Sequence, residues 1–199
     1  SFPEINNIDN SGALKMQEAG HPLLPAAKKA CNDFQIAVKG TQHLITGSNM
    51  SGKSTFLRTV GINICLAYAG APVNAVRFNF VPVRLFTCIK VSDSVIDGIS
   101  YFYAEVKRLK MLLDEIEEGE GRPVIYLIDE IFKGTNNIER LKGSESLIKY
   151  LSGKYGSGLI STHDLELVKL SSLLNTLENF HFREEIKGGK MEFDYRLHR

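Results

Sequence analysis

The amino-acid sequence predicts an α/β fold in which helices flank a sheet of mainly parallel strands. Three observations lead to this prediction. An apolar run at Leu44 to Thr46 enters a glycine-rich loop and then a helical pattern. A second run, Val124 to Ile128, is continuously apolar, as in strands that are buried on both faces of a parallel sheet. Helix and strand patterns alternate between these runs and His163, which is typical of an open α/β sheet.

We expect one domain over residues 1–199, because 199 residues with 43% hydrophobic side chains can bury one substantial core. Residues 1–33 mix proline, asparagine and glycine with short apolar pieces, which predicts an irregular lead-in to a core at residues 34–199. Phe34 to Val38 and Gln42 to Thr46 flank a turn at Gly40. They predict a hairpin whose second strand leads into the glycine-rich loop.

The middle of the chain predicts two helices and one strand. Apolar residues recur at helical spacing from Ser54 to Ala69, and Gly70-Ala71-Pro72 ends this pattern. Residues 78–89 are rich in β-forming residues but contain Pro82, so we expect one strand with an irregular first part. A long amphipathic helix is expected around an apolar stripe formed by Phe102, Val106, Leu109, Leu113 and Ile116. Its polar face is expected to carry Glu105, Lys107, Arg108, Lys110, Glu115 and Glu118.

The last third of the chain continues the alternation. A helix is predicted from Ile138 to Leu151, a short strand at residues 158–162 and a further helix at residues 165–174. Asn179 to Glu185 and Lys190 to Leu197 then predict a hairpin around two glycines.

The loop after Leu44 to Thr46 matches the pattern G-x-x-x-x-G-K-[ST], which is typical of a phosphate-binding P-loop. Gly47 and Gly52 allow the backbone amides to turn inward, and the following helix adds its positive N-terminal end. Lys53 is expected to contact the β- and γ-phosphates, and the Ser54 hydroxyl to ligate Mg²⁺. The alternative is a glycine-rich turn that matches by chance. The residues expected to hold the nucleotide are Gly47, Ser48, Asn49, Met50, Ser51, Gly52, Lys53, Ser54 and Thr55.

Polar residues follow two of the predicted strands, at the edge where an open α/β sheet binds ligands. Asp129 directly follows the buried run and is expected to bind Mg²⁺ through water, while Glu130 orients or deprotonates the attacking water. The alternative is a surface turn with two solvated acids. His163 follows the strand at residues 158–162 and could hydrogen-bond either the γ-phosphate or the water. A structural histidine is the alternative there.

Composition limits the remaining possibilities. The formal net charge of +1 excludes a broad basic field of the kind that coats nucleic acid. Cys31, Cys65 and Cys88 stand far apart and are expected to be small buried side chains in a reducing compartment. The chain starts with Ser1 and carries neither a signal pattern nor a membrane-length apolar run, so we expect a cytoplasmic fragment of a longer protein.

From His21 to Arg199 the sequence resembles the ATPase domain of the MutS family of DNA mismatch-repair proteins. The resemblance covers nearly the whole chain and rests on several segments in family order. These segments are Thr46-Gly47-Ser48-Asn49-Met50-Ser51-Gly52-Lys53-Ser54-Thr55, Phe86-Thr87-Cys88-Ile89, Asp129-Glu130-Ile131 with Gly134-Thr135, Ser161-Thr162-His163 and Asn179-Phe180-His181-Phe182.

The resemblance implies a P-loop NTPase of the ABC type, with a mixed sheet flanked by helices and two domains that meet head to tail. Gly98 to Glu105 resembles the family's signature segment, which implies that Ser100 touches the γ-phosphate held by the partner chain, in trans. It also places Asn32 beside the nucleotide, three positions after Lys29, where many members carry an aromatic residue that stacks on adenine.

The resemblance further implies Mg²⁺-dependent hydrolysis of ATP to ADP and phosphate, coupled to the binding and repair of mismatched DNA by the full-length protein. The partners would be a second copy or a related MutS-type subunit, DNA held by domains outside this chain, and a downstream repair factor. One alternative is a MutS paralogue that acts on other DNA structures or recombination intermediates. Another is a nucleotide-gated dimerisation module with little hydrolysis. A small-molecule kinase would need an acceptor pocket or lid, for which we find no segment.

Several positions depart from the family pattern. Ile99 and Tyr101 stand where the signature segment usually has arginine and threonine, and Ser48 stands where proline is usual. After Gly134-Thr135 the family commonly has Ser-Thr and then Asp-Gly. This chain has Asn136-Asn137 and then Glu139-Arg140.

Overall fold

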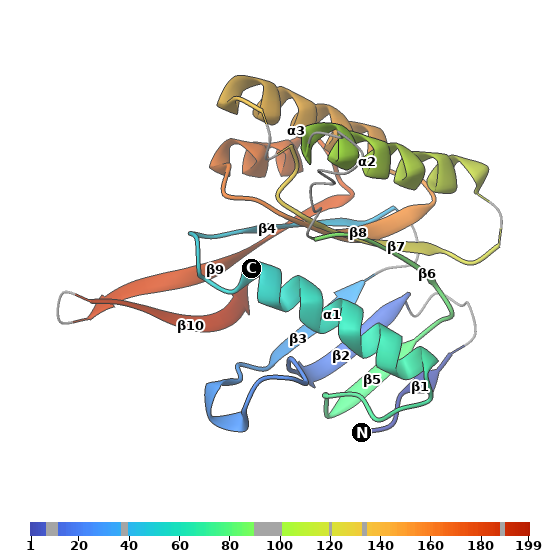
Figure 1. The fold of residues 1–199 in the computed structure, drawn as a ribbon, viewed down its shortest axis with the longest axis vertical. Helices are drawn as coiled ribbons and strands as arrows, with labels where there is room; N and C mark the ends of the chain where they lie inside the picture. The colour runs from blue at the N-terminus through green and yellow to red at the C-terminus, as the bar shows by residue number, and fades with distance from the viewer. Residues whose placement is uncertain (7–11, 37–39, 90–100, 120, 133–134, 188–189) are drawn as a thin grey trace.

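The computed structural model describes residues 1–6, 12–36, 40–89, 101–119, 121–132, 135–187 and 190–199. Within these residues a six-stranded sheet and a four-stranded sheet are flanked by helices (Figure 1). The larger sheet has the spatial order β10 (Lys190–His198), β9 (Leu177–Lys187), β4 (Gln42–Thr46), β8 (Gly156–Ser161), β7 (Val124–Asp129) and β6 (Arg84–Cys88). Neighbouring strands are parallel except β10 and β9. The predicted α/β class is confirmed.

The smaller sheet corrects the prediction of an irregular lead-in. Its spatial order is β1 (Glu4–Ile5), β5 (Arg77–Phe80), β2 (Leu14–Ala19) and β3 (Asn32–Ile36), and a short 3-10 helix, η1 (Ala26–Lys28), precedes β3. Strand β2 pairs antiparallel with both β3 and β5. Its buried positions are Leu14, Met16 and Ala19, separated by charged and amide side chains. Six residues with two large apolar side chains are too few for this alternation to stand out in the sequence.

The predicted hairpin between β3 and β4 is wrong, because the two strands belong to different sheets. In β3, Phe34 and Ile36 are buried while Asp33 and Gln35 are exposed, as expected for a strand with one covered face. Every residue of β4 is buried, and β4 pairs with β8 and β9 in the centre of the larger sheet. The burial patterns of β3 and β4 therefore differ, as expected for strands in two different sheets, although the two strands are neighbours in the sequence.

The single strand predicted at residues 78–89 is also wrong. Strand β5 pairs in the smaller sheet, β6 pairs in the larger one, and Pro82 lies between them. The Tyr68 hydroxyl bridges this crossing, since it donates to the Val83 carbonyl and accepts from the Val83 amide, both at 2.5 Å. Pro82 thus marks a change of sheet.

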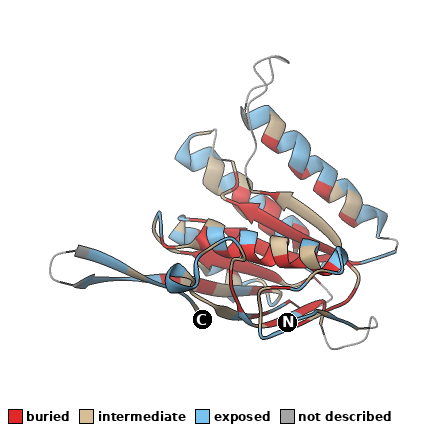
Figure 2. Ribbon diagram, turned by 60° about the horizontal axis from the view of Figure 1, so that its bottom comes forward, coloured by how far each residue is buried: buried red, intermediate tan, exposed pale blue. Residues whose placement is uncertain are grey.

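The helices occupy both faces of the larger sheet. Helix α1 (Lys53–Tyr68) lies between the two sheets, while α2 (Tyr101–Glu118) and α3 (Asn137–Leu151) cover the opposite face (Figure 1). Strand β7 is therefore buried on both faces. Its Ile125 and Leu127 pack in the core on the side of α1, and its Tyr126 and Ile128 pack in the core on the opposite side. Figure 2 shows the buried central strands enclosed by half-exposed helices.

Most of the other predicted elements are confirmed, including α1, α3, β8 and the β9–β10 hairpin. The helix expected at residues 165–174 is a 3-10 helix, η2 (Leu165–Ser172). In α2 the prediction for Glu105 is wrong, because its side chain is buried. Of the three cysteines only Cys88 is buried, and Cys65 is exposed. No helix among the described residues has the length and apolarity needed to cross a membrane.

Candidate functional site

The glycine-rich loop, residues 47–53, connects the end of β4 to the start of α1. Gly47 and Gly52 have φ angles of 146° and 110°, in the region that favours glycine. A Cβ atom at Gly47 would lie 2.7 Å from the Ser51 hydroxyl oxygen. The nearly buried Lys53 ammonium donates to the carbonyl oxygens of Gly47 at 2.7 Å and Ser48 at 2.8 Å. The lysine thus lies across the inside of the loop.

The remaining loop residues differ in exposure. Asn49 and Met50 are exposed at the outer side, and Met50 has a φ angle of 71°. Ser51 is buried, and the Ser48 hydroxyl donates to the Glu184 carboxylate on β9. Lys53 therefore holds the loop from the inside, and the C-terminal hairpin holds it at Ser48, while Asn49 and Met50 are exposed.

Asp129 lies at the end of β7, buried between two hydroxyl groups. Ser54, on the first turn of α1, donates to Asp129 Oδ2 at 2.7 Å, and Ser161, at the end of β8, donates to Oδ1 at 2.5 Å. Two expected metal ligands, Ser54 and Asp129, are thereby in direct contact. Because the carboxyl ends of β7 and β8 meet the helix start here, three segments far apart in sequence form one cluster of oxygen atoms.

Glu130 and His163 lie beside this cluster. Glu130 Oε1 is 3.3 Å from His163 Nδ1, and the Glu130 amide donates to the Ser161 carbonyl at 3.1 Å. The Glu130 side chain is 21% exposed and that of His163 43% exposed, so both can meet a ligand. Glu130 has a φ angle of 57°, which L-residues adopt only when their surroundings impose it.

The contact that fixes this turn comes from a residue that sequence reasoning misplaced. The Glu105 carboxylate in α2 accepts a hydrogen bond from the Phe132 amide at 2.6 Å, and Phe132 also has a positive φ angle, 56°. A Cβ atom at Gly143 of α3 would lie only 2.6 Å from the Phe132 ring, so the ring packs directly against this glycine. Helices α2 and α3 thus both hold the turn that presents Glu130.

A second contact missed from the sequence is the ion pair between Arg140 of α3 and Asp164. Arg140 Nε and one terminal nitrogen each donate to a different Asp164 oxygen at 3.0 Å. This hydrogen bonding holds the pKa of the Asp164 carboxyl below its ordinary value and raises the pKa of Arg140. Arg140 occupies one of the positions where the sequence departs from the family pattern.

Two cavities adjoin the glycine-rich loop. One, of about 310 Å³, lies beside Gly52 and Thr55 and is also lined by Asn32 and Tyr195. Asn32 is held by β10, because its amide nitrogen donates to the Tyr195 carbonyl at 3.2 Å and its oxygen accepts from the Leu197 amide at 2.7 Å. The pairing of β9 and β10 is irregular between Phe193 and Leu197, and this irregularity contains Tyr195.

The second cavity, of about 550 Å³, lies on the other side of the loop. Gly47, Ser48 and His163 line it together with residues of η2 and β9. His163 is therefore accessible from a space that borders the glycine-rich loop.

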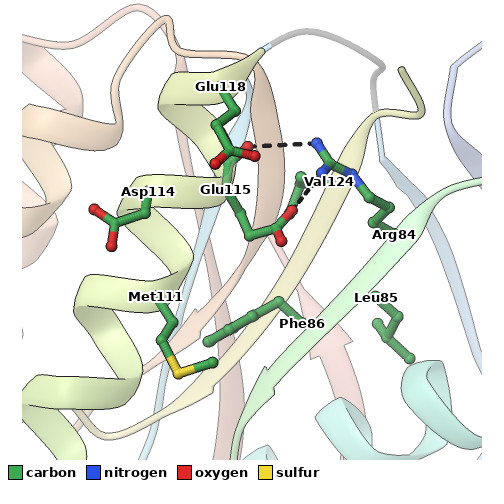
Figure 3. A pocket seen from close by; sticks show the side chains of 8 residues that line it. All are labelled: Arg84, Leu85, Phe86, Met111, Asp114, Glu115, Glu118 and Val124. Carbon is green, nitrogen blue, oxygen red and sulfur yellow. Dashed lines mark hydrogen bonds and ion pairs between the residues drawn. The ribbon is translucent and has the colours of Figure 1, made fainter. Parts of the chain in front are cut away.

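A third cavity, of about 380 Å³, lies away from these residues, between β6 and α2 (Figure 3). Met111 and Phe86 lie on one side of it, and the Arg84–Glu115 ion pair spans the other (Figure 3). None of the residues expected to bind nucleotide or metal lines this cavity.

Ser100, expected to act on a partner's nucleotide, lies outside the described residues, as do Gly98 and Ile99. The described part of α2 starts at Tyr101. The prediction for Ser100 therefore stays a prediction.

The fold and this arrangement define an α/β protein with a glycine-rich loop opposed by acidic residues at strand ends. The sequence model of MutS domain V matches residues 43–199, and the chain belongs to the MutS family. It is 31% identical to the DNA mismatch repair protein MutS of Macrococcus caseolyticus over 96% of this chain and 24% of that protein. It is likewise 31% identical to DNA mismatch repair protein MutS of Aquifex pyrophilus, over 92% of this chain and 22% of that protein.

A eukaryotic relative is similarly close. The chain is 32% identical to MutS protein homolog 4 of Mus musculus, over 85% of this chain and 18% of that protein. The chain thus spans about a quarter or less of the length of these relatives.

Proposed function

We propose that this chain is a Mg²⁺-dependent ATPase domain with a P-loop and an ABC-type fold. The observation that carries the proposal is the contact between Ser54, at the start of α1, and Asp129, at the end of β7, with Glu130 and His163 beside it. Phosphoryl transfer requires mainly positioning and charge neutralisation, and these residues supply both around one loop.

The phosphates of ATP or ADP would lie in the glycine-rich loop. Its backbone amides and the N-terminus of α1 favour an anion, and Lys53 supplies a positive charge inside the loop. The loop residues Gly47 to Thr55 are therefore assigned to nucleotide binding, with Met50 at the exposed outer side.

The donor set at Ser54 and Asp129 fits Mg²⁺, which prefers oxygen ligands and keeps several waters and phosphate oxygens. No group of three or more histidine, cysteine or acidic side chains within the described residues could hold a metal alone. When bound, Mg²⁺ would neutralise charge on the phosphates. Ser161 fixes the Asp129 carboxylate that would hold the ion, by donating to Oδ1.

Glu130 would orient the attacking water and accept its proton. It is close to His163 and partly exposed. Its backbone amide donates to the Ser161 carbonyl, and the turn that follows it is held by the hydrogen bond from the Phe132 amide to Glu105. His163 would bind the water or the γ-phosphate from the neighbouring strand end.

The nucleobase would occupy the 310 Å³ cavity beside Gly52. Its position next to the N-terminus of α1 supports this assignment, as does the presence of Asn32, which the resemblance to the MutS family places near the nucleotide. Tyr195 adds an aromatic ring on a strand that the sequence did not connect to the site.

In the full-length protein we propose that hydrolysis is coupled to the binding and repair of mismatched DNA. The relatives named as DNA mismatch repair proteins support this role. The partners would be a second copy or a related MutS-type subunit that supplies Ser100, DNA bound by other domains, and a downstream repair factor.

The experiment compares ATP hydrolysis by the wild-type chain and Glu130→Gln at saturating ATP and Mg²⁺. We expect turnover to fall about 100-fold or more, because general-base catalysis contributes that much, while nucleotide affinity changes little. Glu115→Gln is the matched control, since Glu115 pairs with Arg84 beside the distant third cavity. Equal rates for wild type and Glu130→Gln would reject Glu130 as the base.

A further inference from the structure

Strand β6 forms one edge of the larger sheet. Within the part of the chain that the structure describes, β6 pairs only with β7, and β10 forms the opposite edge. The Arg84 amide donates to the Pro123 carbonyl at 2.8 Å, so the backbone of Arg84 faces β7. The backbone groups of successive residues in a strand point to opposite sides, and those of Leu85 and Thr87 therefore point away from β7, toward the edge.

A side chain of α2 agrees with this direction. Arg108 Nε donates to the Thr87 carbonyl at 2.7 Å, and Arg108 Cζ lies 5.3 Å from the centroid of the Phe86 ring. Arg108 thus covers one carbonyl group of the edge, while the Leu85 amide and carbonyl and the Thr87 amide still face outward. A row of outward backbone groups is the feature to which an extended chain adds as a further strand.

The 380 Å³ cavity between β6 and α2 lies beside this edge (Figure 3). Leu85, Phe86 and Met111 form its apolar part, and Met111 is 53% exposed. Because strand side chains project alternately from the two faces of a sheet, every second side chain of an added strand would face α2. The edge and the cavity together offer backbone pairing and a pocket for a side chain, which are the two components of strand addition.

The other part of the cavity is acidic. Its lining includes the carboxylates of Asp114, Glu115 and Glu118 and one guanidinium, that of Arg84. Arg84 forms an ion pair with Glu115. Asp114 and Glu118 are both exposed, so they carry the remaining negative charge at the rim of the cavity. A cationic side chain is therefore the complement of this rim.

The spacing of these groups fits an extended segment. Helix α2 runs alongside β6, since its Arg108 and Glu115 contact opposite ends of the strand. With a rise of about 1.5 Å per residue, Asp114 lies about 4.5 Å and Glu118 about 10 Å beyond Met111 along the helix axis. Alternate residues of a strand are about 6.6 Å apart and share a face. An apolar side chain at Met111 therefore places the next side chain on that face between the two carboxylates.

We propose that the β6 edge and the adjoining cavity bind an extended segment of a partner protein in which lysine or arginine follows an apolar residue by two positions. The segment pairs with Leu85, packs its apolar side chain against Met111 and directs its basic side chain between Asp114 and Glu118. The acidic rim repels the phosphates of a nucleic acid, and it opposes pairing of β6 in two copies of this chain, since two rims would meet. The proposal is independent of the proposed ATPase function.

The test is selection of phage-displayed random peptides on the immobilised wild-type chain, with counter-selection against the double variant Asp114→Asn with Glu118→Gln. We expect the retained peptides to carry an apolar residue and, two positions later, lysine or arginine. One retained peptide is then synthesised, and ¹H–¹⁵N NMR of the wild-type chain maps its position. We expect the largest shifts at the amides of Leu85 and Thr87.

Affinity measurements with this peptide separate the effect of charge from that of strand pairing. Asp114→Asn with Glu118→Gln should weaken binding about fivefold, because exposed charge pairs contribute modestly. The matched control, Glu145→Gln with Glu166→Gln, removes the same charge from positions outside the cavity and should leave the affinity unchanged. Methylation of the peptide nitrogens that face β6 should weaken binding about 10-fold or more, whereas methylation of the alternate nitrogens should change it little.

Several results would overturn the proposal. They are the absence of enriched peptides, retained peptides without the basic residue, and amide shifts that lie away from β6. Equal losses from methylation of either set of nitrogens would also do so, because strand pairing uses only alternate amides. Dimerisation of the chain alone, with the same shifts at Leu85 and Thr87, would assign the edge to a second copy instead of a partner protein.

Discussion

At the scale of single residues, hydrogen bonds fix the orientation of the side chains at the candidate site. Asp129 is oriented by hydroxyl groups from two other segments, and Lys53 by the carbonyl groups of its own loop. The motif in the sequence predicted that Ser54 and Asp129 would act on the same ion, and the two side chains are in contact. The contact between Ser161 and Asp129 was not predicted, because a serine at a strand end does not show in the sequence which side chain it will meet.

Replacing Ser54 with alanine tests the metal assignment. We expect Ser54→Ala to weaken ATP binding about 10-fold in the presence of Mg²⁺ and to change it little when the metal is chelated. The proposed metal ligand matters only when Mg²⁺ is present, whereas the hydrogen bond to Asp129 is lost in both conditions. Isothermal titration calorimetry with and without Mg²⁺ measures the difference. Ser146→Ala is the control, since the exposed Ser146 hydroxyl donates to the Lys142 carbonyl one turn back in α3. Equal losses in both conditions would argue against a metal ligand.

His43 gives a prediction for pH. This residue is buried beside Phe34, with ring centroids 4.9 Å apart, and burial lowers its pKa. Because the unfolded chain then binds the proton more readily, the stability is complete above the ordinary histidine pKa of about 6.5 and falls as the pH drops below it. We expect His43→Gln to show a flatter decrease in the free energy of unfolding between about pH 6.5 and 5, measured by urea denaturation. Parallel curves for both proteins would contradict this.

At the scale of elements, the sequence predicted most of the parts that position the site. The central strand β7, helix α1 and strand β8 have strong periodicity or continuous apolar runs, and their ends carry the polar residues. The smaller sheet was missed because its strands are short and alternate weakly. The pairing of β3 with β4 was wrong because adjacency in sequence does not show in which sheet a strand lies.

Helix α2 shows how a stripe can be assigned to the wrong side. The predicted stripe used Val106 and Leu113, whereas the buried residues are Glu105, Leu109, Leu112 and Ile116, which also follow a spacing of three and four. The feature of the sequence that could have indicated this stripe is Glu105, an acidic residue in line with the apolar residues Leu109, Leu112 and Ile116. Its burial is not evident from the sequence, because glutamate is rarely buried without a partner, and the backbone amide that it accepts from is distant in sequence.

Glu105 therefore carries a prediction about stability. Glu105→Ala leaves the Phe132 amide without its acceptor and should cost about 1 to 3 kcal/mol, while Glu105→Gln keeps a carbonyl acceptor and should cost less. Chemical denaturation measures both. Glu118→Ala, on the exposed end of the same helix, should lie within about 0.5 kcal/mol of wild type. Equal losses for the alanine and glutamine variants would mean that the hydrogen bond contributes little.

At the scale of the whole molecule, the two sheets meet at the site. Helix α1 packs between them, and β10 connects them, since its Leu197 amide donates to Asn32 of the smaller sheet while β10 pairs with β9 of the larger sheet. Tyr195 on β10 also lies next to Gly52, 3.2 Å from the position of a Cβ atom there. Binding in the cavity beside Gly52 would thus act on both sheets at once.

The site proposed to be shared between two chains makes a prediction about mixtures of variants. Lys53→Ala would disable the proposed nucleotide loop, and Ser100→Ala would disable the residue proposed to reach the partner's nucleotide, so each protein alone should have little activity. A mixture should recover activity, because the Lys53→Ala chain can supply Ser100 to the intact loop of the other chain. ATPase assays of each variant and of the mixture, at rising concentration, provide the measurement. No recovery at concentrations where the wild type dimerises would contradict a site shared between chains.

The left-handed backbone at Glu130 has an effect beyond the reaction. A positive φ angle costs an ordinary residue about 1 kcal/mol or more, and glycine avoids this cost. Glu130→Gly should therefore melt at a higher temperature than Glu130→Ala, although both lose the carboxylate. In a library of variants selected only for heat resistance, glycine should be enriched at position 130. The position where the proposed reaction needs glutamate is thus one where the backbone alone favours glycine.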